Sequence, residues 1–263
     1  MQITSRQNPR IKEAAALRDR RERQRQRRIL IDGAREISRA IAAGLRPVEA
    51  FVCKELCVAD EARGALSAAI AAGTEVFEVV PSVYAKLQFG ERDDGIIIVA
   101  TMPNRTLSDL RLPSAPLVAV IEGIEKPGNV GAILRSADAA GVDAVIVADG
   151  GTDLFNPNTI RASLGAVFRQ NVCEATSAEA IAWLRQQGLR IIAARPDAAI
   201  EYTAADFCGG LALVLGSEAE GLSDNWRADD MTSVKLPMHG VADSLNVSTT
   251  AAILFYEARR QRR

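Results

Sequence analysis

The sequence predicts an α/β protein built from two domains. Short apolar runs alternate with segments of helical periodicity along most of the 263 residues, which is the pattern of strands connected by helices. In residues 117–263 the strands are continuous apolar runs, such as 211–215, and such runs are typical of a parallel sheet covered on both faces. Residues 103–116 contain three prolines and no strong periodicity. We therefore expect a linker there, preceded by a smaller α/β domain in residues 1–102.

The smaller domain is expected to alternate helices and strands from its N-terminal end. Ser5 or Asn8, followed by Pro9, is a suitable start for a first helix. The pair Asp32-Gly33 is a turn signal that ends the first strand. Strands are expected at 28–31, 48–53, 76–80 and 96–100, and further helices at 34–43, 59–72 and 81–87.

In the larger domain, strands and helices follow in regular order. Strands are expected at 117–122, 144–148, 190–194, 211–215 and 233–236, and helices at 157–167, at 178–187 and after Gly128. The last helix is expected to begin near Asp243 or Ser244, because either residue is a good N-cap and apolar residues then recur at helical spacing. This start places Asn246 inside the first helical turn.

Composition excludes several classes of protein. Hydrophobic residues make up 48% and charged residues 25% of the chain, as in soluble globular proteins. No apolar run approaches the ~20 residues of a membrane span, and we expect no signal peptide. Four scattered cysteines and a single histidine, His239, make no zinc site. Unpaired cysteines suit a reducing cytoplasm, and His239 is expected to be an ordinary surface residue of a loop.

Positive charge is concentrated near the N-terminus. The net charge is −1, yet residues 1–30 hold ten Lys or Arg and three acids, which is +7 locally and leaves −8 for the remainder. A basic segment on a near-neutral body indicates a phosphate-binding surface, with Arg21, Arg25 and Arg28 as candidates. A merely solvated helix face is the alternative. An organelle transit peptide is less consistent with the acids in the segment.

A first polar stretch follows the first strand of the larger domain. The pair Pro127-Gly128 breaks the chain, and Asn129 is then a favourable N-cap for the next helix. Arg135 lies further along that helix. The alternative is an ordinary strand–loop–helix in which Arg135 pairs with Asp138. A dinucleotide site is not indicated, because the G-x-G-x-x-G pattern is absent.

Two more polar stretches lie at strand ends. The strand 211–215 stops at Gly216, and Glu218 follows at the edge where open α/β sheets bind ligands. Ser244 and Asn246 lie where the chain enters the final helix. Asn is unfavourable in a helix interior, so Asn246 is expected to bond buried backbone groups or to position a substrate. The alternative for these residues is a purely structural role as a helix-terminal charge or cap.

The three stretches resemble the motifs of the SpoU-type (TrmH-like) RNA 2′-O-ribose methyltransferases of the SPOUT superfamily. Asn129 and Arg135, six residues apart in PGNVGAILR, match the first motif, and Glu218 in LGSEAEGLS matches the second. SLNVS, preceded by LPM, is similar to the third motif and contains Ser244 and Asn246. The N-terminal SRQNPRIK, a basic stretch and ILIDGAREI are similar to the opening of the ribosomal-protein-like RNA-binding domain of these enzymes. The resemblance covers the whole chain.

The resemblance implies a SPOUT-type fold with a trefoil knot, a homodimer with its site at the subunit interface, and S-adenosylmethionine as cofactor without a metal. It implies that the loops at Gly216, Leu236 and Leu245 hold the cofactor mainly through backbone groups. The implied catalytic residues are Asn129, Arg135, Glu218, Ser244 and Asn246.

The implied reaction is 2′-O-methylation of RNA in the cytoplasm, with Arg21, Arg25 and Arg28 as RNA contacts. In this family proton removal is assigned to the arginine that matches Arg135. Because a guanidinium keeps its proton, the alternative is that Arg135 binds a phosphate and stabilises the developing alkoxide. The separate N-terminal domain favours 23S ribosomal RNA over transfer RNA. A non-catalytic RNA-binding or ribosome-assembly protein is the third possibility.

Overall fold

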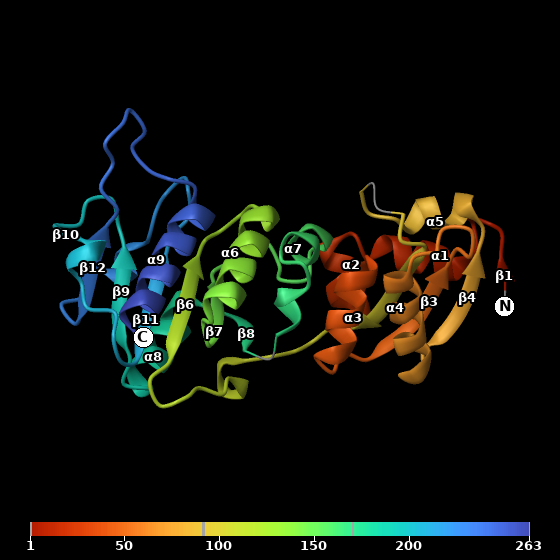
Figure 1. Cartoon of the computed structure of the whole chain (residues 1–263), viewed down its shortest axis with the longest axis horizontal. Coiled ribbons are helices and arrows are strands. Elements are labelled where there is room, and N and C mark those ends of the chain that lie inside the picture. The colour runs from red at the N-terminus through yellow and green to blue at the C-terminus, as the bar shows by residue number, and fades with distance from the viewer. Residues whose placement is uncertain (1, 91–92, 170, 263) are drawn as a thin grey trace. The chain divides into compact units, whose positions relative to one another are not determined.

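The computed structural model describes residues 2–90, 93–169 and 171–262 (Figure 1). Contacts divide the chain into two compact units. Unit 1 comprises Met1–Pro103 together with Phe155–Arg169, and unit 2 comprises Asn104–Leu154 together with Gln170–Arg263. The chain thus returns to unit 1 for one short segment in the middle of the region expected to form the larger domain.

Unit 1 contains a mixed five-stranded sheet in the order β1-β4-β3-β5-β2. The strand β5 runs antiparallel to β2 and β3, while β4 runs parallel to β1 and β3. The elements are β1 (Gln2–Ile3), α1 (Pro9–Ala16), α2 (Arg20–Gln26), β2 (Arg28–Asp32), α3 (Ala34–Ala42), β3 (Pro47–Val52), α4 (Asp60–Ala71), β4 (Glu75–Val79), α5 (Pro81–Leu87), β5 (Ile96–Thr101), α7 (Pro157–Ala162) and the 3-10 turn η2 (Ala166–Phe168).

The core of unit 1 lies between α1, α5 and one face of this sheet. Ile11, Leu17 and Tyr84 from the helical side are fully buried against strand residues. Among these strand residues, the rings of Phe51 and Phe77 stack with centroids 5.7 Å apart. The basic segment contributes a helix that the sequence did not predict, α2. Its N-cap, Asp19, accepts hydrogen bonds from two backbone N–H groups of the first turn.

Unit 2 contains a seven-stranded sheet in the order β10-β12-β9-β11-β6-β7-β8. Every neighbouring pair is parallel, as the sequence predicted. The elements are η1 (Leu107–Asp109), β6 (Leu117–Glu122), α6 (Pro127–Ala140), β7 (Ala144–Ala148), β8 (Val172–Ala175), α8 (Ser177–Gln186), β9 (Arg190–Ala194), β10 (Ile200–Glu201), η3 (Tyr202–Ala204), β11 (Leu211–Leu215), η4 (Asp224–Trp226), β12 (Met231–Lys235) and α9 (Val247–Gln261).

Helices cover both faces of the seven-stranded sheet. Val118, Val120 and Val214 point to one face and pack with Leu184 of α8 and with Trp226. Successive side chains of a strand alternate between faces, so the residues between them point to the opposite side. There α6 and α9 pack against each other, and Figure 1 shows the two helices side by side. The trefoil knot expected for this fold stays a prediction.

Two expected helix starts were wrong, and both errors concern local capping. The helix α6 begins at Pro127, with Lys126 at the cap position, because proline has no N–H to satisfy and is pre-organised for the first helical position. Asn129 therefore lies inside the first turn. The helix α9 begins at Val247, and Asn246 is its N-cap, with φ −53° and ψ 137° outside the helical region. Asn246 is thus at a favourable position for the helix rather than an unfavourable one.

The expected helix 157–167 was also wrong, because it ends at Ala162 as α7. Leu164 and Gly165 have φ of 51° and 81°, in the left-handed region that an α-helix cannot contain. The short turn η2 follows. The strands β1, β8 and β10 were not predicted, since each is only two to four residues long.

A buried carboxylate ties together three segments of unit 2. Glu122, the last residue of β6, is 6% exposed. It accepts hydrogen bonds from Ser177 Oγ (2.6 Å), Ser223 N (2.8 Å), Ser223 Oγ (2.8 Å) and Trp226 Nε1 (2.8 Å). A buried charge requires such partners. Glu122 therefore fixes the start of α8 and the chain that follows β11 relative to β6.

We predict that Glu122→Gln destabilises the protein by roughly 1–3 kcal/mol. The amide nitrogen that replaces one carboxylate oxygen cannot accept a hydrogen bond, so a buried donor is left unpaired. Urea unfolding measures the effect, with the exposed Glu61→Gln as the matched control. A Glu122→Gln protein as stable as the control would show that the four hydrogen bonds do not hold this region.

Candidate active site

Three loops of unit 2 meet beyond the carboxyl ends of the parallel strands. They follow β6, β11 and β12. The first loop leads into α6, whose first turn contains Asn129, and the other two contain the second and third polar stretches of the sequence. Because parallel strands all point the same way, their outgoing loops lie at one edge of the sheet. The edge brings together residues that are more than a hundred positions apart in the chain.

Asn129, Glu218 and Asn246 form a polar trio at this edge. Asn129 Nδ2 donates a short hydrogen bond to Glu218 Oε1. Asn246 Nδ2 lies 3.4 Å from both Asn129 Oδ1 and Glu218 Oε1, at the outer limit of hydrogen bonding. Lys126 Nζ lies 3.9 Å from Glu218 Oε2. The trio thus joins one residue from each of the three polar stretches around a carboxylate.

The side-chain amide of Asn246 has two roles. Its oxygen accepts from Ser248 N (2.9 Å) and from Ser248 Oγ (2.6 Å), which caps α9. Its nitrogen is directed to Asn129 and Glu218. The helix cap therefore fixes the orientation of the amide and presents its donor end to the trio.

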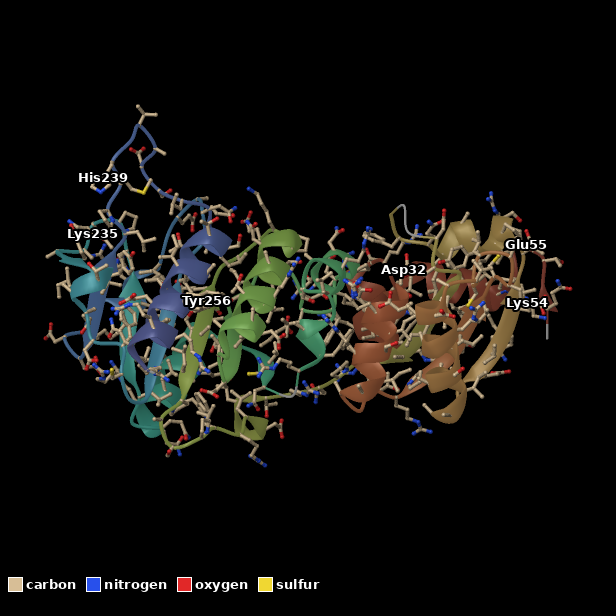
Figure 2. All side chains as sticks on the ribbon, viewed as in Figure 1. Asp32, Lys54, Glu55, Lys235, His239 and Tyr256 are labelled. Atoms are coloured by element: carbon tan, nitrogen blue, oxygen red, sulfur yellow. The ribbon has the colours of Figure 1, made fainter. Side chains whose placement is uncertain are left out.

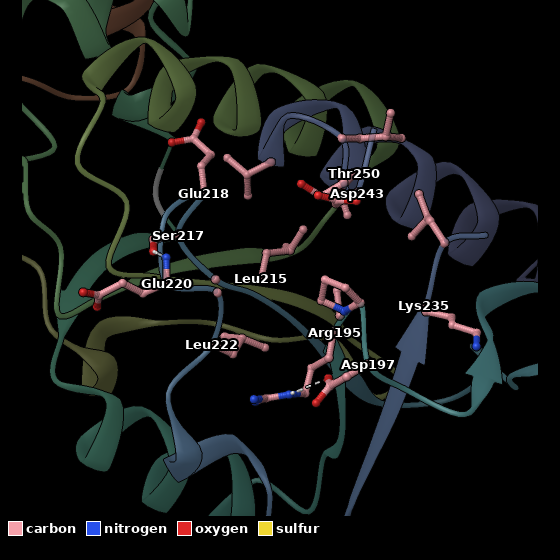
Figure 3. A pocket seen from close by; sticks show the side chains of 18 of the residues that line it. Arg195, Asp197, Leu215, Ser217, Glu218, Glu220, Leu222, Lys235, Asp243 and Thr250 are labelled. Carbon is pink, nitrogen blue, oxygen red and sulfur yellow. Dashed lines mark hydrogen bonds and ion pairs between the residues drawn. The ribbon is translucent and has the colours of Figure 1, made fainter. Parts of the chain in front are cut away.

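A cavity of ≈ 430 Å³ lies beside the trio, a volume in the usual range for a small-molecule site. Gly216, Leu236 and Leu245, the positions that the resemblance implies for the cofactor, line it together with Ser244; that they bind the cofactor stays a prediction. Figure 3 shows Leu215 and Leu222 among the apolar side chains around the cavity, with Ser217 and Glu218 at one side.

The backbone at Gly216 is approached too closely for any side chain. A Cβ at this position would collide with backbone atoms of Gly221 and Leu222. Ser217 and Gly221 exchange backbone hydrogen bonds of 3.1 and 3.0 Å, and Gly221 has φ +69°, which glycine adopts without strain. The two glycines therefore fold the segment 216–221 into a tight loop that forms one wall of the cavity.

The opposite wall contains three charged residues that the sequence did not indicate. Arg195 is only 8% exposed and donates from Nη1 to Ser223 O (3.2 Å), which links the wall to the Glu122 network. Asp197 accepts from Arg227 Nη2 (2.7 Å) and lies 3.5 Å from Arg195 Nε (Figure 3). The hydrogen bond from Arg227 keeps the pKa of Asp197 below its ordinary value. The sequence did hold one signal, a charged residue directly after the apolar strand β9.

Arg135 does not join the trio. It is exposed, and its position six residues after Asn129 on α6 places it about 120° around the helix axis from that residue. It is not among the residues that line the cavity. His239 is exposed on the loop between β12 and α9 (Figure 2), as expected for a surface residue.

The basic candidates in unit 1 have unequal surroundings. Arg25 donates three hydrogen bonds to Glu22, the shortest 2.7 Å, and these lower the pKa of Glu22. Arg28 lies 3.8 Å from Glu49. Arg21 is exposed on α2. Two of the three arginines are thus paired with carboxylates.

Metal-binding clusters and membrane-spanning helices are both absent from the residues that the structure describes. No group of three or more His, Cys, Asp or Glu side chains there could hold a metal ion. Within the same residues, no helix is both long enough and apolar enough to cross a bilayer.

Two family models match the chain. Residues 116–256 match the SpoU rRNA Methylase family, and residues 8–97 match the MRM3-like substrate binding domain. The match at 116–256 spans more than half of the chain.

Several known proteins are similar to this chain over nearly its full length. The 23S rRNA (uridine(2479)-2′-O)-methyltransferase of Streptomyces viridochromogenes is 32% identical over 99% of this chain and 92% of that protein. A crystal structure described as an RNA 2′-O ribose methyltransferase is 45% identical with a TM-score of 0.86, covering 99% of both chains. The AdoMet-bound rRNA methyltransferase from Sinorhizobium meliloti is 25% identical with a TM-score of 0.89, covering 99% of this chain and 97% of that one.

We predict that Gly216→Ala weakens S-adenosylmethionine binding about tenfold or more, since overpacking at a rigid site costs ~1–3 kcal/mol. Isothermal titration calorimetry measures the change. Gly64→Ala is the matched control, because a Cβ at Gly64 meets nothing within 4 Å. Equal affinity for the two variants would show that the tight loop does not shape the cofactor site.

We also predict that Asn246→Ser keeps the melting temperature but lowers methyl transfer roughly 10- to 100-fold. Serine caps a helix as well as asparagine, but its shorter side chain removes the amide N–H that lies 3.4 Å from Glu218 Oε1, and lost orientation at a reacting group can cost up to about 100-fold in rate. Asn246→Ala should lose about 0.5–2 kcal/mol of stability in addition. Undiminished turnover of the serine variant would restrict Asn246 to its capping role.

Proposed function

Because the chain belongs to the SpoU rRNA methylase family, we propose that it transfers the methyl group of S-adenosylmethionine to a ribose 2′-hydroxyl of 23S ribosomal RNA. The observation that carries this proposal is the polar trio of Asn129, Glu218 and Asn246 beside a cavity of ≈ 430 Å³. A methyl donor and a hydroxyl acceptor require such an arrangement, with one pocket for the donor and polar groups next to it that orient the acceptor.

The cavity residues fit the cofactor. Leucine side chains at positions 215, 222, 236 and 245 offer apolar surface to an adenine ring, and the tight loop at Gly216 brings backbone N–H and C=O groups close to a ligand. The bound cofactor supplies a methyl group already activated by a positively charged sulfur. The transfer then yields S-adenosylhomocysteine, a 2′-O-methyl ribose and one proton.

The trio is placed to hold the acceptor ribose. The Glu218 carboxylate can accept a hydrogen bond from the 2′-hydroxyl, while Asn129 and Asn246 keep this carboxylate oriented. We do not assign proton removal to Arg135, because a guanidinium is a poor proton acceptor. In our proposal it binds the phosphate next to the target ribose and stabilises the developing alkoxide, and the proton leaves to water or phosphate.

We also propose that the protein is a homodimer. Arg135 lies about 120° around α6 from Asn129, on another side of the helix, and in our proposal it serves a trio on a second chain. Tyr256 of α9, the helix that packs against α6, is 54% exposed (Figure 2), which suits an isologous contact. The proposed compartment is the cytoplasm, since the four cysteines are free.

Ribosomal RNA is the favoured substrate because the relative from Streptomyces viridochromogenes is named for 23S rRNA and residues 8–97 match a substrate binding domain. Transfer RNA is the second candidate. The complete trio argues against a protein that only binds RNA.

The test is transfer of a labelled methyl group to total RNA from a strain that lacks this protein, followed by mapping of 2′-O-methyl positions. Label in a single 23S position is expected. Label confined to transfer RNA would move the activity to that substrate, and no label in any RNA would contradict the proposed function.

We predict that Arg135→Ala abolishes turnover and leaves cofactor affinity within a few-fold. Heterodimers of Arg135→Ala with Glu218→Gln subunits should regain about half of the wild-type rate, because one of their two sites combines an intact Arg135 with an intact trio. The controls are the two variants alone, each inactive. Failure of the mixed dimer to regain activity would show that Arg135 does not act across the interface.

A further inference from the structure

Four cations of unit 1 are held in place by backbone carbonyl groups. They are Arg6, Arg18, Lys86 and Arg161, and we call them the carbonyl-held strip. Three of their acceptor carbonyls belong to residues 86–89, at the end of α5 and in the loop after it. Unit 1 includes Arg161 because the segment Phe155–Arg169 belongs to it.

Hydrogen bonds connect the strip from one member to the next. Arg6 Nε donates to Ser82 O (2.7 Å), and Lys86 Nζ donates to Arg6 O (2.7 Å). Arg18 Nη2 then donates to Lys86 O (3.0 Å) and to Gln88 O. Each cation is therefore anchored to the backbone beside its neighbour.

Phe89 joins the last two members. The guanidinium carbons of Arg18 and Arg161 each lie 5.9 Å from the centroid of its ring, within cation–π range. Arg161 Nη1 also donates to Phe89 O (2.7 Å). From inside the unit, Asp32 Oδ2 accepts from Phe89 N (2.6 Å) (Figure 2). The backbone of Phe89, in the loop after α5, is thus held by Arg161 at its carbonyl group and by Asp32 at its N–H group.

Among the described residues, the strip members have no carboxylate partner, whereas three other arginines of unit 1 have one. Arg25 is bonded to Glu22, Arg28 lies near Glu49, and Arg10 lies 2.5 Å from Glu49. In each of these pairs the carboxylate largely neutralises the positive charge of the arginine. In contrast, among residues 2–90, 93–169 and 171–262 no carboxylate lies within ion-pair distance of a strip member, and the nearby Asp93 accepts from Gln88 instead. A carbonyl oxygen orients a cation without neutralising it.

An oriented and unneutralised guanidinium is suited to phosphate. Arg has five N–H donors in a planar fork, and the carbonyl bonds and the ring leave several of them free for a phosphate oxygen. Because the side chains are already held, binding loses less rotamer entropy. Arg6 and Arg18 are exposed, and Lys86 and Arg161 are partly exposed.

We propose that the carbonyl-held strip is the surface by which unit 1 binds the RNA sugar–phosphate backbone. It takes this role in place of Arg25 and Arg28, two of the three arginines that the sequence suggested, because each lies beside a carboxylate. The inference rests on the proposed function for the identity of the partner. It also assigns an RNA contact to Arg161, which lies within the part of the chain matched by the methylase family model, 116–256.

The test compares single substitutions in the full-length protein. Affinity for a 23S ribosomal RNA transcript is measured at several salt concentrations for Arg6→Gln, Arg18→Gln and Arg25→Gln. Glutamine keeps a donor for the carbonyl but loses the charge. Arg63→Gln, at an exposed arginine paired with Asp60, is the baseline control, and Arg18→Lys tests rescue by charge.

Arg6→Gln and Arg18→Gln should each weaken binding and lower the log–log salt slope by roughly 0.7–0.9, the value of one lost phosphate contact. Arg25→Gln should match the control, and Arg18→Lys should restore most of the slope. Unchanged slopes for the strip variants, or an equal loss for Arg25→Gln, would overturn the proposal. Cofactor affinity, measured on the same proteins, should stay unchanged. If the strip variants show this loss of slope but the wild-type protein transfers no methyl group to RNA, the proposed function is contradicted and the proposal for the strip still holds.

Discussion

The parallel direction of all seven strands in unit 2 is the constraint on which its site depends. Three loops that leave β6, β11 and β12 are thereby brought to one edge of the sheet. Direction alone does not fix the loops, however. The Glu122 carboxylate at the end of β6 binds Ser223 and Trp226 after β11, and Ser223 in turn holds Arg195 on the cavity wall. Sheet direction and one buried charge together shape the cavity.

Acidic and basic side chains have different roles in the two units. In unit 2 the Glu218 carboxylate lies between the amides of Asn129 and Asn246, and Lys126 lies 3.9 Å away. Such a nearby cation reduces the repulsion between Glu218 and an incoming phosphate. In unit 1 the ordered cations are held by carbonyl groups and by Phe89. A phosphate backbone needs fixed positive charge, and a reacting hydroxyl needs a fixed acceptor.

The sequence predicted the parallel sheet and most of its strands, because buried strands are continuous apolar runs. The resemblance to a family, rather than any pattern of apolar residues, singled out Gly216, Leu236 and Leu245, which line the cavity. The sequence failed where the answer depends on one backbone angle or on a distant contact. The start of α9 depends on the extended backbone of Asn246, and the break after α7 depends on Leu164. Whether Arg25 is a free cation depends on Glu22, three residues away on the same helix, a pairing that a count of charges cannot show.

We propose that a cofactor bound in the cavity of Gly216, Leu236 and Leu245 donates its methyl group beside the trio of Asn129, Glu218 and Asn246. A crystal structure of the protein with S-adenosylmethionine tests this most directly. We predict that the adenine lies among the leucines of the cavity and that the sulfur-bound methyl faces Glu218. A cofactor bound anywhere else, or one whose methyl points away from the trio, would contradict the account.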